Sequence, residues 1–231
     1  MKRILGAFLV LSVLANIVLL VRFDNRNKPV ASSTRPSEIK RSKKEMITSS
    51  PKTGTVVFLG TSLTEGFRVR DFISTPSIRN FGISGATIDD LLEIYPSVIT
   101  KDVLDVRIEI GINDIKSTSW SDSLFKKDFK DLIDGIRNMS HPSCRVFIQS
   151  ILPVNSKYFG DRTSFINEQV IHVNDFLEDF CAGHQPFIQY IDLHPHFFNG
   201  AELNPELTYD GLHLNSKGYL IWLGLLPKPT S

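Results

Sequence analysis

From residue 53 onward, the chain alternates short apolar runs with segments of helical periodicity. The apolar runs favour five buried strands, at about residues 55–59, 77–81, 105–110, 145–152 and 187–191. Between these runs, apolar residues spaced three and four apart predict helices, at residues 87–99, 121–139, 164–181 and 216–226. Strands that alternate with helices are typical of a three-layer α/β domain built on a parallel sheet.

Residues 4–21 form an apolar run without a charged side chain, just long enough to cross a bilayer as a helix. We expect residues 1–22 to be an uncleaved membrane anchor. A cleavable signal peptide is the alternative, because Val13 and Ala15 are small enough to precede a cleavage site. Under both interpretations the body lies outside the cytoplasm, since a short basic flank before an apolar run is the usual export signal.

The charge of the chain is unevenly distributed. Residues 23–52 are rich in Ser, Lys, Arg, Thr and Pro without apolar periodicity, which predicts a disordered basic linker. Residues 22–52 carry nine Lys or Arg against three acids, whereas residues 53–231 carry fifteen against twenty-two. The body therefore has a net charge of −7, and an acidic body argues against nucleic acid as a partner.

Polar residues follow several of the predicted strands. Ser62 comes after the first strand and Gly85 after the second. Asn113 follows the third strand, and Asp210 and His213 precede the last helix. Because ligands bind at the carboxyl ends of the strands in open α/β sheets, we expect these five residues to converge there.

Acyl transfer requires this set of residue types. A Ser62 hydroxyl is a weak nucleophile until a base removes its proton, and His213 would be that base. Asp210, three residues earlier, can reach the far ring nitrogen and fix the tautomer. The N–H groups of Ser62 and Gly85 and the amide of Asn113 would face the oxyanion. Taken singly, Ser62 is also a plausible helix cap and Asp210 to His213 a plausible turn, but their conjunction favours catalysis.

Four blocks resemble those of the SGNH, or GDSL, hydrolases, over about residues 55–226. They are Gly60-Thr61-Ser62-Leu63, Asn80 to Gly85, Gly111-Ile112-Asn113-Asp114 and Asp210-Gly211-Leu212-His213. The chain has Thr61 where the family motif usually has Asp. That Asp shapes the loop and is not the triad acid, so the difference bears on rate and loop geometry.

The resemblance implies a hydrolase domain over residues 53–231 with a flavodoxin-like sheet of strand order 2-1-3-4-5. It also implies Ser62 as the nucleophile, Gly85 and Asn113 in the oxyanion hole, and Asp210 with His213 completing the triad. The reaction would be the hydrolysis of an ester without a metal or other cofactor.

We therefore expect a membrane-tethered serine esterase that acts on a small-molecule or glycan ester. The substrate that we expect is an ester of a short acyl group such as acetyl, carried on a carbohydrate or a lysophospholipid. Residues beside the four blocks either line the acyl site or belong to the core: Leu63, Ile112, Pro153, Tyr209 and Leu212. Two alternatives stay open, an O-acyltransferase acting on an envelope polysaccharide and a non-catalytic surface-binding module with the same fold.

Two further groups of residues have side chains that can bind a metal ion or form a disulfide. Asp192, His194 and His196 lie close together, but their spacing is loose and no further Cys or His cluster supports a metal site. Cys144 and Cys181 would either pair in an oxidising compartment or remain buried thiols.

Overall fold

The computed structural model describes residues 34–49, 54–73 and 77–229. The predicted anchor at residues 1–22 and the first part of the predicted linker lie outside these ranges, and both stay predictions. Among the described residues, no helix is both long enough and apolar enough to cross a membrane.

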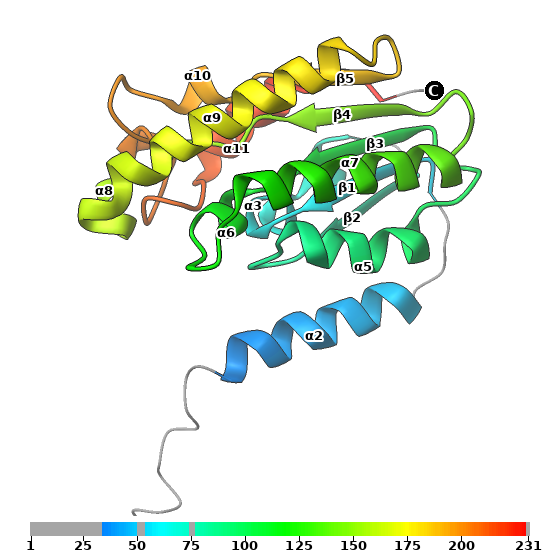
Figure 1. Ribbon diagram of the computed structural model, residues 1–231, viewed down its shortest axis with the longest axis horizontal. Coiled ribbons are helices and arrows are strands. Elements are labelled where there is room, and N and C mark those ends of the chain that lie inside the picture. Colours follow the sequence, from blue (N-terminus) through cyan, green and yellow to red (C-terminus); the bar gives the residue numbers. More distant parts are fainter. Residues whose placement is uncertain (1–33, 50–53, 74–76, 230–231) are drawn as a thin grey trace, which may run out of the picture. The chain divides into compact units, whose positions relative to one another are not determined.

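Five parallel strands form a sheet in the order β2-β1-β3-β4-β5 (Figure 1). They are β1 (Val56–Gly60), β2 (Ile78–Gly82), β3 (Asp105–Glu109), β4 (Arg145–Gln149) and β5 (Ile188–Ile191). The strand order and direction confirm the predicted flavodoxin-like sheet. The largest error in a strand boundary is at β4, which ends three residues before the predicted limit.

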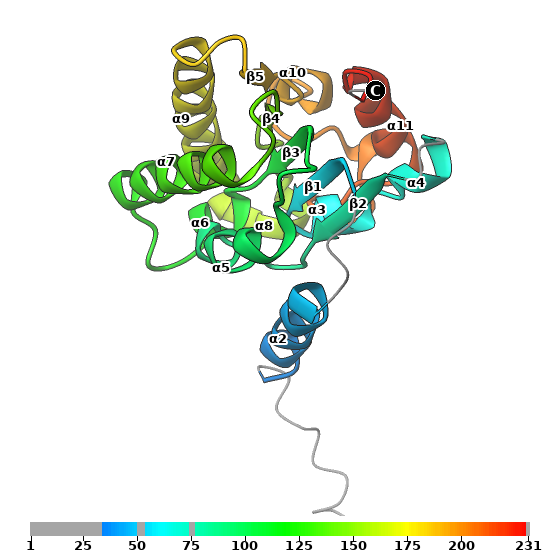
Figure 2. The ribbon, with the colours of Figure 1, turned by 90° about the vertical axis from the view of Figure 1, so that its right-hand side faces the viewer.

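Helices cover both faces of this sheet (Figure 2). One face is covered by α5 (Ile88–Val98), α7 (Asp122–Met139) and α9 (Thr163–Ala182), and the other by α4 (Val69–Phe72) and α11 (Ser216–Leu225). Alternating side chains of β1 separate accordingly, because successive residues of a strand point to opposite faces. Val57 and Leu59 join the core under the first set of helices, whereas Val56 and Phe58 pack against the second. The three-layer prediction is confirmed.

The structure adds short elements that the sequence pattern did not predict. Besides α4, they are α3 (Ser62–Gly66), α6 (Ile112–Ile115), α8 (Ser156–Phe159), α10 (His194–Phe197) and two 3₁₀ helices, Gly160–Arg162 and Pro205–Leu207. Each has about one turn, which is too few positions to show a helical period. Most of them lie in the loops that follow the strands, where the candidate residues also lie.

Helix α2 (Thr34–Ser49) stands where the sequence predicted a disordered linker, so the structure differs from that prediction. Residues of this helix from Ser42 onward belong to the same compact unit as the sheet. Lys43 pairs with Glu65 at 3.1 Å, Lys44 pairs with Asp90 at 3.1 Å, and Ile47 is buried. Composition alone does not reveal such tertiary contacts, which stabilise a helix of Lys, Glu and Arg residues whose intrinsic propensity is already good.

Candidate active site

The structure brings three of the predicted residues into one hydrogen-bonded row. Ser62 begins α3 directly after β1, and Asp210 and His213 lie in the loop between β5 and α11. Ser62 Oγ is 3.0 Å from His213 Nε2, and His213 Nδ1 is 2.7 Å from Asp210 Oδ2. These are the distances that a nucleophile, a base and an orienting carboxylate require.

The loop around Asp210 fixes this carboxylate through its own backbone. Asp210 Oδ1 accepts hydrogen bonds from the N–H groups of Leu212 at 2.9 Å and His213 at 2.7 Å. Burial acts to raise the pKa of Asp210, but the hydrogen bonds from His213 and Leu212 outweigh it and hold that pKa below its ordinary value. Gly211 has φ +97°, a left-handed conformation that favours glycine at this turn. The local sequence therefore builds a charged carboxylate aimed at the imidazole.

The turn that carries Ser62 packs tightly on the end of β3. A side chain at Gly60 would collide with Thr64 and with the backbone carbonyl of Glu109, so this position requires glycine. Thr61 caps α3, because its Oγ1 accepts a hydrogen bond from the N–H of Leu63 at 3.2 Å. The turn thus places Ser62 at the first position of a helix, at the carboxyl edge of the sheet.

A buried carboxyl group that the sequence reasoning missed lies beneath this turn. Glu109 is fully buried, and its Oε2 accepts a hydrogen bond from Thr61 Oγ1 at 2.6 Å. Burial raises the pKa of Glu109 to about 7, although the hydrogen bond from Thr61 acts to lower it. The sequence held only a weak signal, because Glu109 is one of three charged residues, with Asp105 and Arg107, in a strand expected to be buried.

The candidate oxyanion donors come from the turns after β2 and β3. Gly85 has φ +74°, and a side chain there would meet no atom within 4 Å. Asn113 is 7% exposed, and its Nδ2 donates a hydrogen bond to the carbonyl of Ala86 at 2.7 Å. An amide nitrogen carries two hydrogens, so this bond orients the group and leaves a second hydrogen for another acceptor. The structure therefore brings Asn113 beside the turn that contains Gly85.

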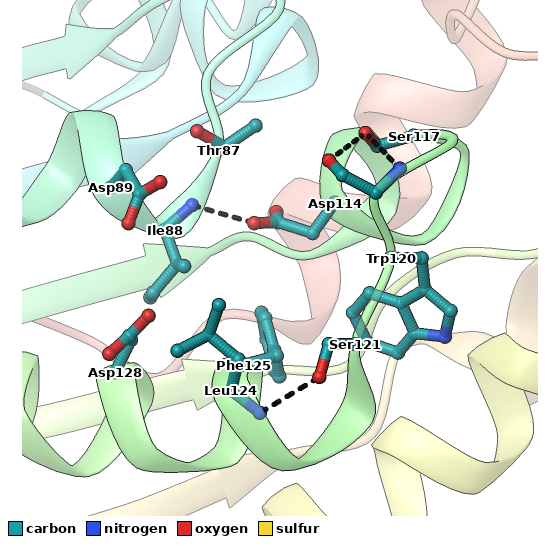
Figure 3. Close-up of a pocket in the computed structure, with 11 residues that line it drawn as sticks. Thr87, Ile88, Asp89, Asp114, Ser117, Trp120, Ser121, Leu124, Phe125 and Asp128 are labelled. Atoms are coloured by element: carbon teal, nitrogen blue, oxygen red, sulfur yellow. Dashed lines mark hydrogen bonds between the residues drawn. The ribbon is translucent and has the colours of Figure 1, made fainter.

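Asp114, the residue after Asn113, holds the beginning of α5. Its Oδ1 accepts a hydrogen bond from the N–H of Ile88 at 3.0 Å (Figure 3). Burial raises the pKa of Asp114 to about 7. The same side chain lines a pocket of about 110 Å³ together with Trp120 and Phe125. Asp114 thus links α6 to the beginning of α5, and among the described residues no hydrogen bond joins it to Ser62.

Four of the five residues predicted either to line the acyl site or to join the core are buried. Leu63, Ile112 and Leu212 belong to the hydrophobic clusters of the core, and Pro153 is also buried. Tyr209 is 62% exposed, and its ring stacks on that of His213 with a centroid distance of 5.8 Å.

Tyr158, which the sequence reasoning did not select, lies on another side of the same histidine. Its ring is 6.4 Å from that of His213, in an edge-to-face arrangement, and the side chain is 47% exposed. Helix α8 brings Tyr158 there, because Asn155 at its start donates a backbone hydrogen bond to the carbonyl of Gly211 at 2.8 Å. Two exposed aromatic rings therefore flank His213.

Neither a metal site nor a disulfide is found in the part of the chain that the structure describes. Within residues 34–49, 54–73 and 77–229, no group of three or more His, Cys, Asp or Glu side chains could hold a metal ion. This includes Asp192, His194 and His196. Cys144 and Cys181 are buried free thiols, and burial raises the pKa of both.

Comparison with known sequences gives matches of two kinds. The model of the GDSL-like Lipase/Acylhydrolase family matches residues 58–221. An N-acylneuraminate cytidylyltransferase from Streptococcus agalactiae is 26% identical over 144 residues, which are 62% of this chain and 32% of that protein. One from Escherichia coli is 27% identical over 177 residues, which are 72% of this chain and 38% of that protein. The chain thus spans about a third of the length of the curated relatives it matches.

Solved structures show the same fold at low sequence identity. A GDSL-like lipase from Bacteroides thetaiotaomicron has a TM-score of 0.65 and 22% identity, and the match covers 80% of this chain and 94% of that one. An acetylxylan esterase from Geobacillus stearothermophilus has a TM-score of 0.58 and 16% identity, with 76% and 94% of the two chains covered. At these identities the likeness concerns the fold.

Proposed function

Because the chain belongs to the GDSL-like lipase/acylhydrolase family, we propose that it hydrolyses esters and that Ser62, His213 and Asp210 are its catalytic triad. One observation carries this proposal. Ser62 Oγ lies 3.0 Å from His213 Nε2, and the other ring nitrogen of His213 lies 2.7 Å from a carboxylate whose pKa is lowered.

The chemistry follows from this row of atoms. Ser62 Oγ attacks the carbonyl carbon of the ester while His213 Nε2 takes the hydroxyl proton. The C–O bond to the leaving group then breaks, and His213 returns the proton to the departing alcohol. A water molecule, deprotonated by His213, hydrolyses the acyl-enzyme and regenerates Ser62. Asp210 keeps the histidine oriented and stabilises the imidazolium in both halves of the reaction.

The developing oxyanion would be stabilised by donors from three loops: the N–H groups of Ser62 and Gly85 and the side-chain amide of Asn113. The hydrogen bond from Asn113 to the carbonyl of Ala86 supports this role, because it fixes the amide plane before substrate binds. Preorganised donors of this kind are each worth about 3 kcal/mol in the transition state.

A short acyl ester of a carbohydrate is the substrate class that the site supports best. Leu63, Ile112 and Leu212 are committed to the core and present little apolar surface for a long acyl chain. The exposed rings of Tyr158 and Tyr209 beside His213 offer flat surfaces on which the apolar face of a sugar ring can pack. Two of the similar proteins have names that refer to carbohydrates, xylan in one and neuraminate in the other.

The full chain should be assayed with p-nitrophenyl esters of increasing acyl length, beside Ser62→Ala and Asn113→Ala. We expect turnover of the acetyl ester and a decline with chain length. Ser62→Ala should lower kcat at least about 10³-fold and Asn113→Ala about 10²- to 10³-fold. Circular dichroism of each variant provides the control for folding. Equal turnover by the wild type and a folded Ser62→Ala variant would contradict the assignment of the nucleophile.

A further inference from the structure

Glu109 has no part in the mechanism above, although it is hydrogen-bonded to Thr61, the residue before the nucleophile. It ends β3 and is paired in register with Gly60, the last residue of β1. The side chain is fully buried, and Thr61 Oγ1 donates a hydrogen bond of 2.6 Å to its Oε2. Burial of a carboxyl group opposes folding unless the group is well paired. A carboxyl group at this position is therefore unfavourable for stability unless a specific contact offsets its burial.

The hydroxyl of Thr61 connects this carboxyl to the nucleophile turn. Its hydrogen points to Glu109, so its lone pairs are left for the N–H of Leu63 at 3.2 Å. The backbone carbonyl of Thr61 accepts a further hydrogen bond from the N–H of Glu65 at 2.9 Å. Ser62 lies between Thr61 and Leu63, so both of its neighbours in the chain are held by these bonds.

Resting on the proposed role of Ser62, we propose that Glu109 is a positioning residue that acts through Thr61 to hold the Ser62 hydroxyl within reach of His213. Glu109 fixes the direction of the Thr61 hydroxyl, the hydroxyl fixes the first turn of α3, and this turn places Ser62 Oγ 3.0 Å from His213 Nε2. A displacement of about 1 Å at such a contact costs about 10²-fold in rate.

A purely structural role makes different predictions from this one. If Glu109 only satisfied the Thr61 hydroxyl, its loss would change stability and rate together. When both partners of a buried hydrogen bond are replaced by apolar groups of similar shape, stability can stay nearly unchanged, whereas removal of one partner leaves the other unsatisfied and is destabilising. The positioning role therefore predicts that the double variant Thr61→Val/Glu109→Met keeps its stability while the reaction at Ser62 slows.

The experiment uses the full chain in four variants: Thr61→Val, Thr61→Ser, Glu109→Met and the double variant Thr61→Val/Glu109→Met. Two rates are measured, kcat for p-nitrophenyl acetate and the rate of covalent labelling of Ser62 by a fluorophosphonate, together with KM for p-nitrophenyl acetate. Thr61→Val and Glu109→Met should each lower kcat and the labelling rate about 10- to 100-fold, with KM within about two-fold. Thr61→Ser, which keeps the hydroxyl, should stay within about two-fold of the wild type.

The double variant tests whether the two residues act as one unit. We expect its rates to lie within about two-fold of those of the slower single variant, because both changes break the same hydrogen bond between Thr61 and Glu109. Thr100→Val is the matched control. Like Thr61, Thr100 accepts a hydrogen bond at its Oγ1 from the backbone N–H two residues later, that of Asp102. Thr100 lies before the start of β3, at the end of the strand opposite to Glu109. The control should leave both rates within about two-fold of the wild type.

Three outcomes would overturn the positioning role: rates in Thr61→Val that equal those of Thr100→Val, a failure of Thr61→Ser to retain activity, or additive losses in the double variant. Failure of the proposed function is distinguishable, because Ser62→Ala would then retain hydrolysis of p-nitrophenyl acetate. Loss of hydrolysis in Ser62→Ala together with full activity in Thr61→Val would reject only the role of Glu109.

Discussion

Two carboxyl groups, one on the rim of the site and one on its floor, have opposite environments. Asp210 on the rim is partly exposed and accepts hydrogen bonds from two backbone N–H groups and from His213, and its pKa is lowered. Glu109 on the floor is fully buried, and its pKa is raised to about 7. The same functional group thus carries charge where donors surround it and resists ionisation where the core surrounds it. The charged carboxylate that proton transfer needs is therefore Asp210, on the rim.

The largest effect should come from removing the charge of the rim carboxylate. Asp210→Asn keeps the size of the side chain but neither fixes the useful tautomer of His213 nor stabilises the imidazolium, so kcat should fall about 10³- to 10⁴-fold. The measurement is kcat for p-nitrophenyl acetate with the full chain. Glu109→Gln, the matched change on the floor, retains an acceptor for Thr61 and should cost less than about ten-fold. A larger loss in Glu109→Gln than in Asp210→Asn would show that the charge needed for proton transfer does not lie on Asp210.

The rim was largely predictable from the sequence, whereas the floor was not. Ser62, Asn113, Asp210 and His213 could be selected because together they supply the nucleophile, the base, the orienting carboxylate and an oxyanion donor of one reaction, although each taken singly also fits a helix cap or a turn. Glu109 did not stand out, because its role depends on the register that places β3 beside Gly60. Such pairing is set by contacts between residues distant in the chain, and a single sequence does not display them.

Side-chain direction was the second property that the sequence left open. Leu63, Ile112 and Leu212 adjoin site residues in the chain yet point into the core. Tyr158, more than fifty residues before His213, reaches that histidine because α8 is hydrogen-bonded to the loop at Gly211. Neighbouring positions in a sequence therefore do not identify the lining of a site, because direction is decided by how the loops fold back.

The raised pKa of Glu109 should also make the stability of the protein depend on pH. Glu109 ionises near its ordinary pKa of 4.5 in the unfolded chain but only near 7 in the folded one. Between these values the folded state binds more protons, so this group makes the free energy of unfolding fall as pH rises, by about 3 kcal/mol in all. Glu109→Gln should remove that part of the decline.

Urea denaturation between pH 4.5 and 8 measures this difference. Asp114, whose pKa is also raised to about 7, contributes equally to the wild type and to the variant and therefore cancels. Asp210 has the opposite sign, because a lowered pKa gives stability that is present above about pH 4 and is lost in stronger acid. Identical pH profiles for the wild type and Glu109→Gln would show that Glu109 is charged in the folded protein across this range.

The smallest effect concerns the aromatic part of the rim. Tyr158→Ala and Tyr209→Ala should each raise KM for an acetylated pyranoside about 3- to 10-fold, because stacking of this kind is worth about 1 kcal/mol. Neither change should alter kcat or KM for ethyl acetate, which has no ring to stack. Phe165→Ala is the matched control, since Phe165 on α9 is a comparably exposed aromatic side chain at 52%.

Changes at Tyr158 and Tyr209 should affect substrate binding, whereas changes at Thr61 and Glu109 should affect the chemical step. Loss of Tyr158 or Tyr209 removes contacts with the bound sugar and leaves Ser62 in place, so the change appears in KM. Loss of the link between Thr61 and Glu109 leaves those contacts and displaces the nucleophile, so the change appears in kcat. An equal loss of kcat toward ethyl acetate in Tyr209→Ala would show that its ring orients His213, to which it lies parallel within 14°, and would move Tyr209 from substrate binding to the support of the base.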